Sequence, residues 1–174
     1  MLILLTGGSA CGKSTYGEQT AMQLGSPRYY IATMQPDGPD ATRRIARHRA
    51  MRANRGFQTM ERYTDLAGLV LPEPHSVALL ECICNLTANE MFSPHGAGPA
   101  AEEAVLAGVE ALSRQCRHLL VVTNEVGCDG TAYLPETMAY VAALGRINQT
   151  LASWAHHVWE LVCGIPLVRK GTLL

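Results

Sequence analysis

Short apolar runs alternate along this chain with longer segments in which apolar residues recur at helical spacing. Runs rich in Leu, Val, Ile and Tyr are typical of strands buried on both faces, as in a parallel sheet. The strands predicted in this way are Leu2–Thr6, Arg28–Thr33, Phe57–Met60, Ser76–Leu80, His118–Thr123 and Val158–Cys163.

Helices are predicted between these strands. They cover Lys13–Leu24, Pro39 to about Arg52, Asn85–Phe92, Ala100–Cys116 and Pro135–Ala155. Pro39 fits the first turn of its helix, where a missing N–H costs nothing. Regular alternation of strand and helix predicts an α/β fold, with a mostly parallel sheet and helices on both faces.

Composition narrows the classes of protein that are possible. The chain has 174 residues, which suits one domain spanning 1–174, and 48% of them are hydrophobic. With 14 basic and 15 acidic residues the net charge is −1, which argues against disorder and against a general nucleic-acid surface. Six Cys without a CxxC pair favour free thiols in the reducing cytoplasm. We expect neither a signal peptide nor a membrane span.

The strongest motif lies between the first predicted strand and the first predicted helix. It reads Gly7-Gly8-Ser9-Ala10-Cys11-Gly12-Lys13-Ser14 and fits the phosphate-binding P-loop, G-x4-G-K-[ST]. Glycines let successive N–H groups point at an anion, and the following helix offers its positive end. Lys13 would reach the terminal phosphates, and the Ser14 hydroxyl would help to hold Mg²⁺. A Gly-rich turn that binds nothing is the ordinary alternative, and it fits this context poorly.

A P-loop site usually needs a carboxylate at the end of a neighbouring strand. Glu81 ends an apolar run and is our candidate for the Mg²⁺ shell, because a buried acid needs a cation or another partner. A glutamate that merely enters solvent at a strand end is the alternative. Glu125 ends another apolar strand and is a second candidate for the same crevice, without an assigned role.

Arginines are concentrated in one part of the chain. Seven of the 14 basic residues are Arg between Arg43 and Arg62, opposed there only by Glu61. Arg44, His48 and Arg52 are four residues apart and share one face of the predicted helix. This pattern suits a bound phosphate, because the Arg fork binds oxygens in pairs and a neutral imidazole could attack phosphorus. From this segment alone, a solvated basic face with an incidental His is the more ordinary interpretation.

The chain resembles the bifunctional adenosylcobinamide kinase / adenosylcobinamide-phosphate guanylyltransferases of cobalamin biosynthesis, almost end to end. Besides the P-loop, the resemblance rests on Ile31-Ala32-Thr33, Arg44-Ile45-x-x-His48-Arg49, Leu79-Leu80-Glu81-Cys82, Thr123-Asn124-Glu125-Val126-Gly127, Gly145-Arg146-x-Asn148-Gln149 and Gly164-Ile165-Pro166. The order of these motifs is far more specific than the P-loop, which many families share.

The resemblance implies a P-loop NTPase-type fold and a two-step enzyme. ATP or GTP phosphorylates adenosylcobinamide, and GTP then gives GMP to the product through a guanylylated histidine, which matches His48. The resemblance also implies a homotrimer and a nucleotide site beyond the P-loop. The matching residues are Ala32, Thr33, Met34, Arg49, Ala50, Met51, Arg52, Glu61 and Glu81.

The chain departs from this family pattern in one helix. Two Arg and one Asp of the family become Met138, Val141 and Ala142, so corrinoid binding or assembly is expected to differ. Two alternatives therefore stay open: a diverged small-molecule kinase without the guanylyltransferase step, and a non-enzymatic nucleotide-binding regulator.

Overall fold

The structure is a computed structural model that describes residues 1–127, 130 and 133–174. Within these ranges, the side chains of Asp40, Arg44, His48 and Met51 lie outside the description.

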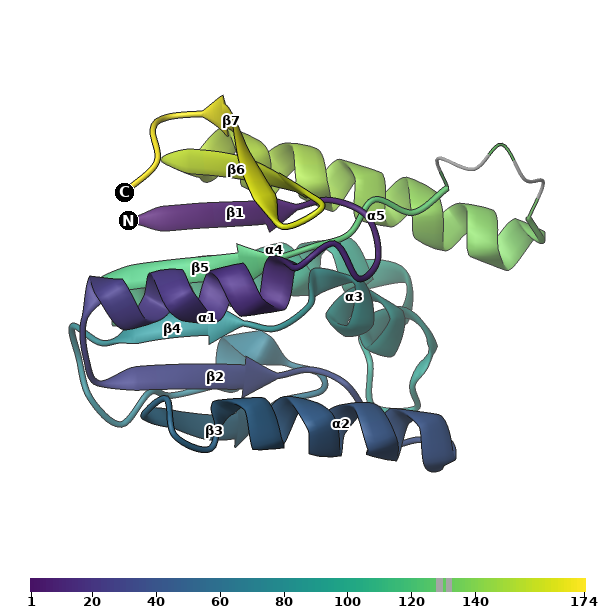
Figure 1. Cartoon of the computed structure of the whole chain (residues 1–174). Helices are drawn as coiled ribbons and strands as arrows, with labels where there is room; N and C mark the ends of the chain where they lie inside the picture. Colours follow the sequence, from purple (N-terminus) through teal and green to yellow (C-terminus); the bar gives the residue numbers. More distant parts are fainter. Residues whose placement is uncertain (128–129, 131–132) are drawn as a thin grey trace.

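The described residues form one seven-stranded sheet with the order β3-β2-β4-β5-β1-β6-β7. All neighbouring strands are parallel except β6 and β7, which form an antiparallel hairpin at one edge (Figure 1). The strands are β1 (Leu2–Thr6), β2 (Arg28–Ala32), β3 (Phe57–Glu61), β4 (Val77–Leu80), β5 (His118–Val122), β6 (His157–Val162) and β7 (Ile165–Lys170).

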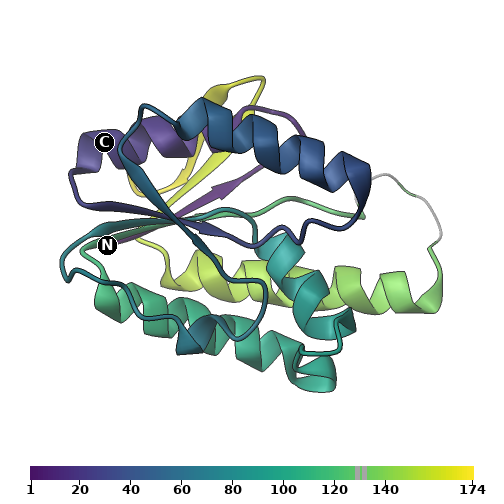
Figure 2. The ribbon, with the colours of Figure 1, turned by 90° about the horizontal axis from the view of Figure 1, so that it is seen from below.

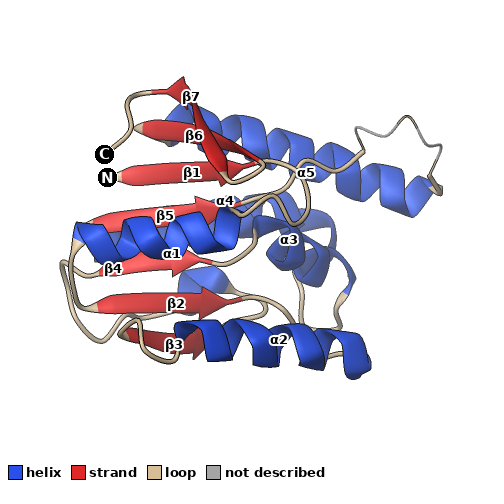
Figure 3. Ribbon diagram, in the orientation of Figure 1, coloured by secondary structure: helices blue, strands red, loops and turns tan. Residues whose placement is uncertain are grey.

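Helices cover both faces of the sheet (Figures 2 and 3). One face carries α1 (Lys13–Leu24) and α2 (Gly38–Arg52), and the other carries α3 (Ile83–Phe92), α4 (Ala101–Gln115) and α5 (Pro135–Trp154). Two short 3-10 turns, η1 (Leu66–Gly68) and η2 (Gly98–Ala100), lie in the connections. The predicted α/β class with helices on both faces is therefore confirmed.

The sheet separates two hydrophobic clusters. Leu2 and Leu4 of β1 belong to the cluster under α3, α4 and α5, whereas Ile3 and Leu5 belong to the cluster under α1. Successive strand residues point to opposite faces, so a strand covered on both sides must be apolar throughout. This is the physical basis of the apolar runs in the sequence.

The predicted elements agree with the structure to within one or two residues at most ends, but β7 was missed. The strand contains Pro166 and ends in Arg169-Lys170, and it lies at the sheet edge with most of its residues exposed. Edge strands tolerate Pro and charge and lack the continuous apolar pattern of buried strands.

Because the strands are parallel, the loops that follow several of them meet at the carboxyl end of the sheet. The P-loop follows β1, Thr33 follows β2, Glu61 ends β3, Glu81 follows β4 and Asn124 follows β5. In open α/β sheets, ligands bind where such carboxyl ends meet.

No described helix is both long enough and apolar enough to cross a membrane.

Candidate nucleotide-binding site

The loop between β1 and α1 has the backbone geometry that its glycines predict. Gly7 has φ 133° and Gly12, directly before α1, has φ 100°. A Cβ on Gly7 would lie 2.5 Å from the carbonyl oxygen of Leu161 in β6. Only glycine fits both this conformation and this close approach.

Lys13 is held inside this loop. Its side chain is 6% exposed, and Nζ donates to the carbonyl oxygens of Gly7 and Gly8 at 2.7 and 2.5 Å. A buried ammonium is costly unless its donors are satisfied. The loop carbonyls therefore keep the positive charge of Lys13 at the first turn of α1.

The turn between β6 and β7 supports the loop from outside. The N–H of Gly164 donates to the carbonyl oxygen of Cys11 at 2.8 Å. A Cβ on Gly12 would lie 3.2 Å from the Cα of Gly164. The sequence motif around Gly164 had no assigned role, and the structure places it as a support for the P-loop.

A cavity of about 210 Å³ opens in front of the loop. Ser9 to Thr15 form one wall, and the other lining residues include Met34, Arg47, Glu81, Asn85 and Asn124. The structure thus brings Lys13, Ser14 and Glu81 to one cavity, as the motif and the strand-end argument anticipated. Arg47, Asn85 and Asn124 were missed, although Asn124 lies in the motif that contains Glu125.

Glu81 is fixed at this cavity by the backbone at the end of β2 and directly after it. Its N–H donates to the carbonyl oxygen of Ile31 at 3.0 Å, and Oε2 accepts the N–H of Thr33 at 3.2 Å. The carboxylate therefore stays at the carboxyl end of the sheet instead of extending into solvent. Glu125, the second candidate, accepts a hydrogen bond from Thr6 at 3.4 Å.

A narrow cleft continues from this cavity between α2 and the ends of β2, β3 and β4. It shares Met34 and Glu81 with the P-loop cavity, and its other lining residues are Ala32, Ile45, Arg49, Arg52, Glu61 and Tyr63. Most of the residues that the resemblance assigned to the nucleotide site therefore lie along one continuous surface.

Glu61 is paired at the rim of this cleft. Its carboxylate accepts from Arg49 of α2 and from the Tyr63 hydroxyl, the latter at 2.9 Å. Burial, and then the bond to Glu61, raise the pKa of the Tyr63 phenol. The phenol therefore remains a proton donor to Glu61 at neutral pH.

Arg52, the last residue of the predicted face with Arg44 and His48, is buried at the end of α2. It is 5% exposed, and its guanidinium carbon lies 3.4 Å from the centroid of the Tyr30 ring. Arg52 nevertheless also lines the cleft beside α2. The side chains of Arg44, His48 and Met51 lie outside the described residues, so their part of the predicted face is not tested.

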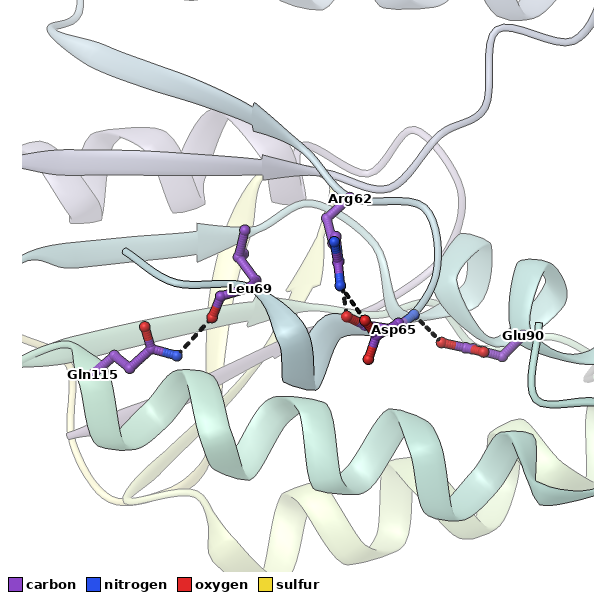
Figure 4. A network of polar contacts seen from close by, with 5 residues as sticks. All are labelled: Arg62, Asp65, Leu69, Glu90 and Gln115. Carbon is purple, nitrogen blue, oxygen red and sulfur yellow. Dashed lines mark hydrogen bonds and ion pairs between the residues drawn. The ribbon is translucent and has the colours of Figure 1, made fainter. Parts of the chain in front are cut away.

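The arginine cluster also has more acidic partners than the sequence suggested. Arg55 forms an ion pair with the buried Glu18 of α1 at 2.6 Å, and Arg62 pairs with Asp65 (Figure 4). Glu61 is the one acidic residue within Arg43–Arg62, and folding brings Glu18 to the cluster from another helix.

Two thiols lie where α3 begins. Cys84 is buried, and its Sγ accepts the N–H of Asn124 at 3.3 Å. A hydrogen bond from the Cys82 thiol is the main cause that lowers the pKa of Cys84. The expected buried free thiols are found at Cys84 and Cys116, whereas Cys163 is exposed and Cys128 lies outside the described residues. Across the described part of the chain, no three His, Cys, Asp or Glu side chains are grouped as metal ligands.

The sheet order, the loop after β1 and the Lys13–Glu81 cavity define a P-loop nucleotide-binding protein. A solved structure with a similar fold supports this assignment. The flagellar accessory protein FlaH from Methanocaldococcus jannaschii is similar with a TM-score of 0.51 and 12% identity, over 98% of this chain and 78% of that one. At this level of identity the likeness concerns the fold alone.

The chain belongs to the cobinamide kinase / cobinamide phosphate guanyltransferase family, whose family model matches residues 3–168. The bifunctional adenosylcobalamin biosynthesis protein CobU of Escherichia coli (strain K12) is 34% identical, over 98% of this chain and all of that protein. The CobU protein of Salmonella typhimurium is 32% identical over the same shares. CobP of Pseudomonas aeruginosa is 30% identical, over 97% and 96%.

Proposed function

We propose that this protein phosphorylates adenosylcobinamide with ATP or GTP and then transfers GMP from GTP to adenosylcobinamide phosphate. The observation that carries the proposal is family membership over residues 3–168, joined to a cavity lined by both the P-loop lysine and a strand-end carboxylate. A non-enzymatic regulator is not favoured, because the family and the relatives are named for enzymatic or bifunctional biosynthetic roles.

In the kinase step the P-loop binds the triphosphate. Its N–H groups and the start of α1 attract the phosphate oxygens, and Lys13 offsets the charge that builds up on the transferred phosphoryl group. Mg²⁺ commonly takes one or two protein oxygens, with phosphates and water completing its shell. Ser14 and Glu81, two oxygen donors lining one cavity, fit that pattern, and the ion would neutralise charge between the phosphates.

In the guanylyltransferase step we assign His48 of α2 as the nucleophile. Its imidazole forms a nitrogen–phosphorus bond to the α-phosphate of GTP while the bond to the β-phosphate oxygen breaks and pyrophosphate leaves. A phosphate oxygen of adenosylcobinamide phosphate then attacks the same phosphorus and frees His48. Support comes from the cleft beside α2, where Ala32, Arg49 and Glu61 lie in line with the P-loop cavity.

Covalent labelling tests this assignment. Incubation of the protein with α-labelled GTP and Mg²⁺ should give a labelled chain with acid-labile, alkali-stable label, as expected for a phosphoramidate. His48→Ala should remove the label, whereas His95→Ala, at an exposed loop histidine, should keep it. Label that survives in His48→Ala would refute the nucleophile, and adenosylcobinamide left unphosphorylated by the wild type would refute the kinase step.

A kinase without the second step is the alternative that one observation favours. Met138 and Ala142 are exposed on α5, and Val141 lies against Gly127, where the family pattern has two Arg and an Asp. These substitutions lie outside the core, and they leave α5 without three charges of the family pattern. Phosphorylation of adenosylcobinamide without any labelled protein would establish this alternative.

We further propose that residues 1–174 act as a single transferase domain, in the cytoplasm and as a homotrimer. The trimer rests on the resemblance to the family. Sedimentation velocity checks it, because the expected species has three times the 18.8 kDa mass of the chain.

A further inference from the structure

One side-chain amide of α3 joins the two loops that carry the cleft residues. Asn89 Nδ2 donates to the carbonyl oxygen of Thr33 at 2.8 Å and to that of Tyr63 at 2.9 Å. An amide NH₂ group has two hydrogens, and this geometry uses both. The two carbonyls belong to segments that follow β2 and β3.

These carbonyls lie where the chain leaves the sheet. Thr33 stands between Ala32 and Met34, which line the cleft, and Tyr63 is itself a lining residue close to Glu61. Backbone groups beyond a strand end have lost their ladder partners and need others when they are covered. Asn89 supplies the partner at both strand ends at once.

Thr33 is fixed from three sides. It is fully buried, its N–H donates to Glu81 Oε2 at 3.2 Å, and its hydroxyl donates to the carbonyl oxygen of Cys82 at 3.0 Å. The bond from Asn89 to its carbonyl is the third. The peptide that leads into Met34 therefore has little freedom of its own, and Met34 lines both the cavity and the cleft.

The next residue of α3, Glu90, binds the backbone of the turn that follows β3. Glu90 is 2% exposed, and Oε1 accepts the N–H of Asp65 at 2.6 Å while Oε2 accepts the N–H of Ala97 at 2.9 Å. Arg62 also donates to the carbonyl oxygen of Asp65 at 2.8 Å (Figure 4). The turn after Glu61 is thus attached to α3 at two successive positions.

We propose that Asn89 is a positioning residue for nucleotide binding. By joining the segments after β2 and β3, it fixes Met34 on one wall of the cleft relative to Glu61 and Tyr63 on the other. A site whose supporting bonds are preformed binds its ligand without having to order the loops first. The inference rests on the proposed function, because it takes the cleft as part of the nucleotide site.

Gln115 of α4 offers a matched control. Its amide also makes two bonds to loop backbone, donating to the carbonyl oxygen of Leu69 (Figure 4) and accepting from the N–H of Leu71, both at 2.8 Å. Its loop contributes no residue to the lining of the cavity or the cleft. Asn89→Ala and Gln115→Ala should therefore lower the thermal midpoint to a similar extent.

Only Asn89→Ala should weaken the binding of a fluorescent GTP analogue, by about tenfold, because one or two lost hydrogen bonds to ordered backbone are of that size. Gln115→Ala should bind as the wild type does. Equal affinities in the two variants would overturn the inference alone. If the wild type did not bind the analogue at all, the proposed function would be overturned as well.

Asn89→Asp keeps the shape of the side chain and gives a second readout if Asn89→Ala does not fold. At pH 8 its carboxylate faces two carbonyl oxygens and cannot donate. Partial burial against two carbonyl oxygens raises the pKa of this carboxyl, so lowering the pH to 5.5 increases the fraction of protonated acid, which can donate one hydrogen bond. The affinity of Asn89→Asp relative to the wild type should therefore rise as pH falls, and a ratio independent of pH would overturn the positioning role.

Discussion

Replacing Arg55 with methionine should destabilise the protein, because it removes the ion-pair partner of a buried carboxylate on α1. Glu18 is fully buried, and its Oε2 accepts from Arg55 Nη1 at 2.6 Å. Its Oε1 has no hydrogen-bond partner among the described residues. Methionine keeps the apolar stem of Arg55 and removes only the charge and its donors.

The size of the effect follows from the burial of the pair. Breaking a buried ion pair by removing one partner costs about 3–5 kcal/mol. The Arg55 side chain is 27% exposed, and Arg52 also lies close enough to attract Glu18. Because solvent and Arg52 compensate for part of the loss, we expect about 2–4 kcal/mol at pH 8.

The loss should depend on pH in a defined direction. Burial raises the pKa of Glu18 from 4.5, and Arg55 opposes this rise, so the pKa is higher still in Arg55→Met. A folded state with a raised carboxyl pKa holds its proton more tightly than the unfolded chain, so its stability falls as pH rises from 4.5 through the folded pKa. The difference in the free energy of unfolding between variant and wild type should therefore be small near pH 4.5 and largest at pH 8.

Urea unfolding followed by far-UV circular dichroism at several pH values measures this difference. Arg114→Met is the control, because Arg114 pairs with Glu110 on the surface of α4, with side chains 72% and 52% exposed. That variant should lose less than about 1 kcal/mol at any pH. Glu18→Gln added to Arg55→Met should recover most of the loss. A difference for Arg55→Met that does not grow with pH would refute the reasoning.

Two further predictions concern packing and a thiol. Gly108→Ala should lower the free energy of unfolding by about 1–2 kcal/mol without changing GTP affinity, because the new Cβ would lie 2.6 Å from Leu66 Cβ; a raised thermal midpoint would contradict this. Iodoacetamide should label Cys84 below the pH range of an ordinary thiol, because bonds from Cys82 and the backbone lower its pKa, while burial raises the pKa of Cys116 to about 11. Peptide mass spectrometry after labelling at pH 5 to 9 measures both, and faster labelling of Cys116 than of Cys84 at pH 7 would show the assignment to be wrong.

Local sequence was sufficient for the elements and for the P-loop. Strands β1 and β5 are almost entirely apolar because helices cover both faces of the sheet. Such a run of consecutive apolar residues can be recognised from the sequence. The bonds from Lys13 to Gly7 and Gly8 join residues at most six positions apart. A motif whose contacts are this short in sequence can be read without the fold.

The order of the strands, and not the local pattern, decided which polar groups meet. Glu18 and Arg55 are 37 residues apart, and Asn89 lies 56 residues from Thr33. Nothing in their immediate surroundings marks them as partners. Arg52 shows the same limit, because helical spacing could not indicate that its guanidinium lies against the Tyr30 ring of β2.

The sequence by itself therefore determined the strand–helix alternation, the phosphate loop and the family. The tertiary structure decided which arginines are paired with acids of the chain and which amide joins the loops around the cleft. The physical reason is that periodicity and short-range hydrogen bonds depend on neighbouring residues, whereas the partners of a buried charge depend on which strands lie side by side.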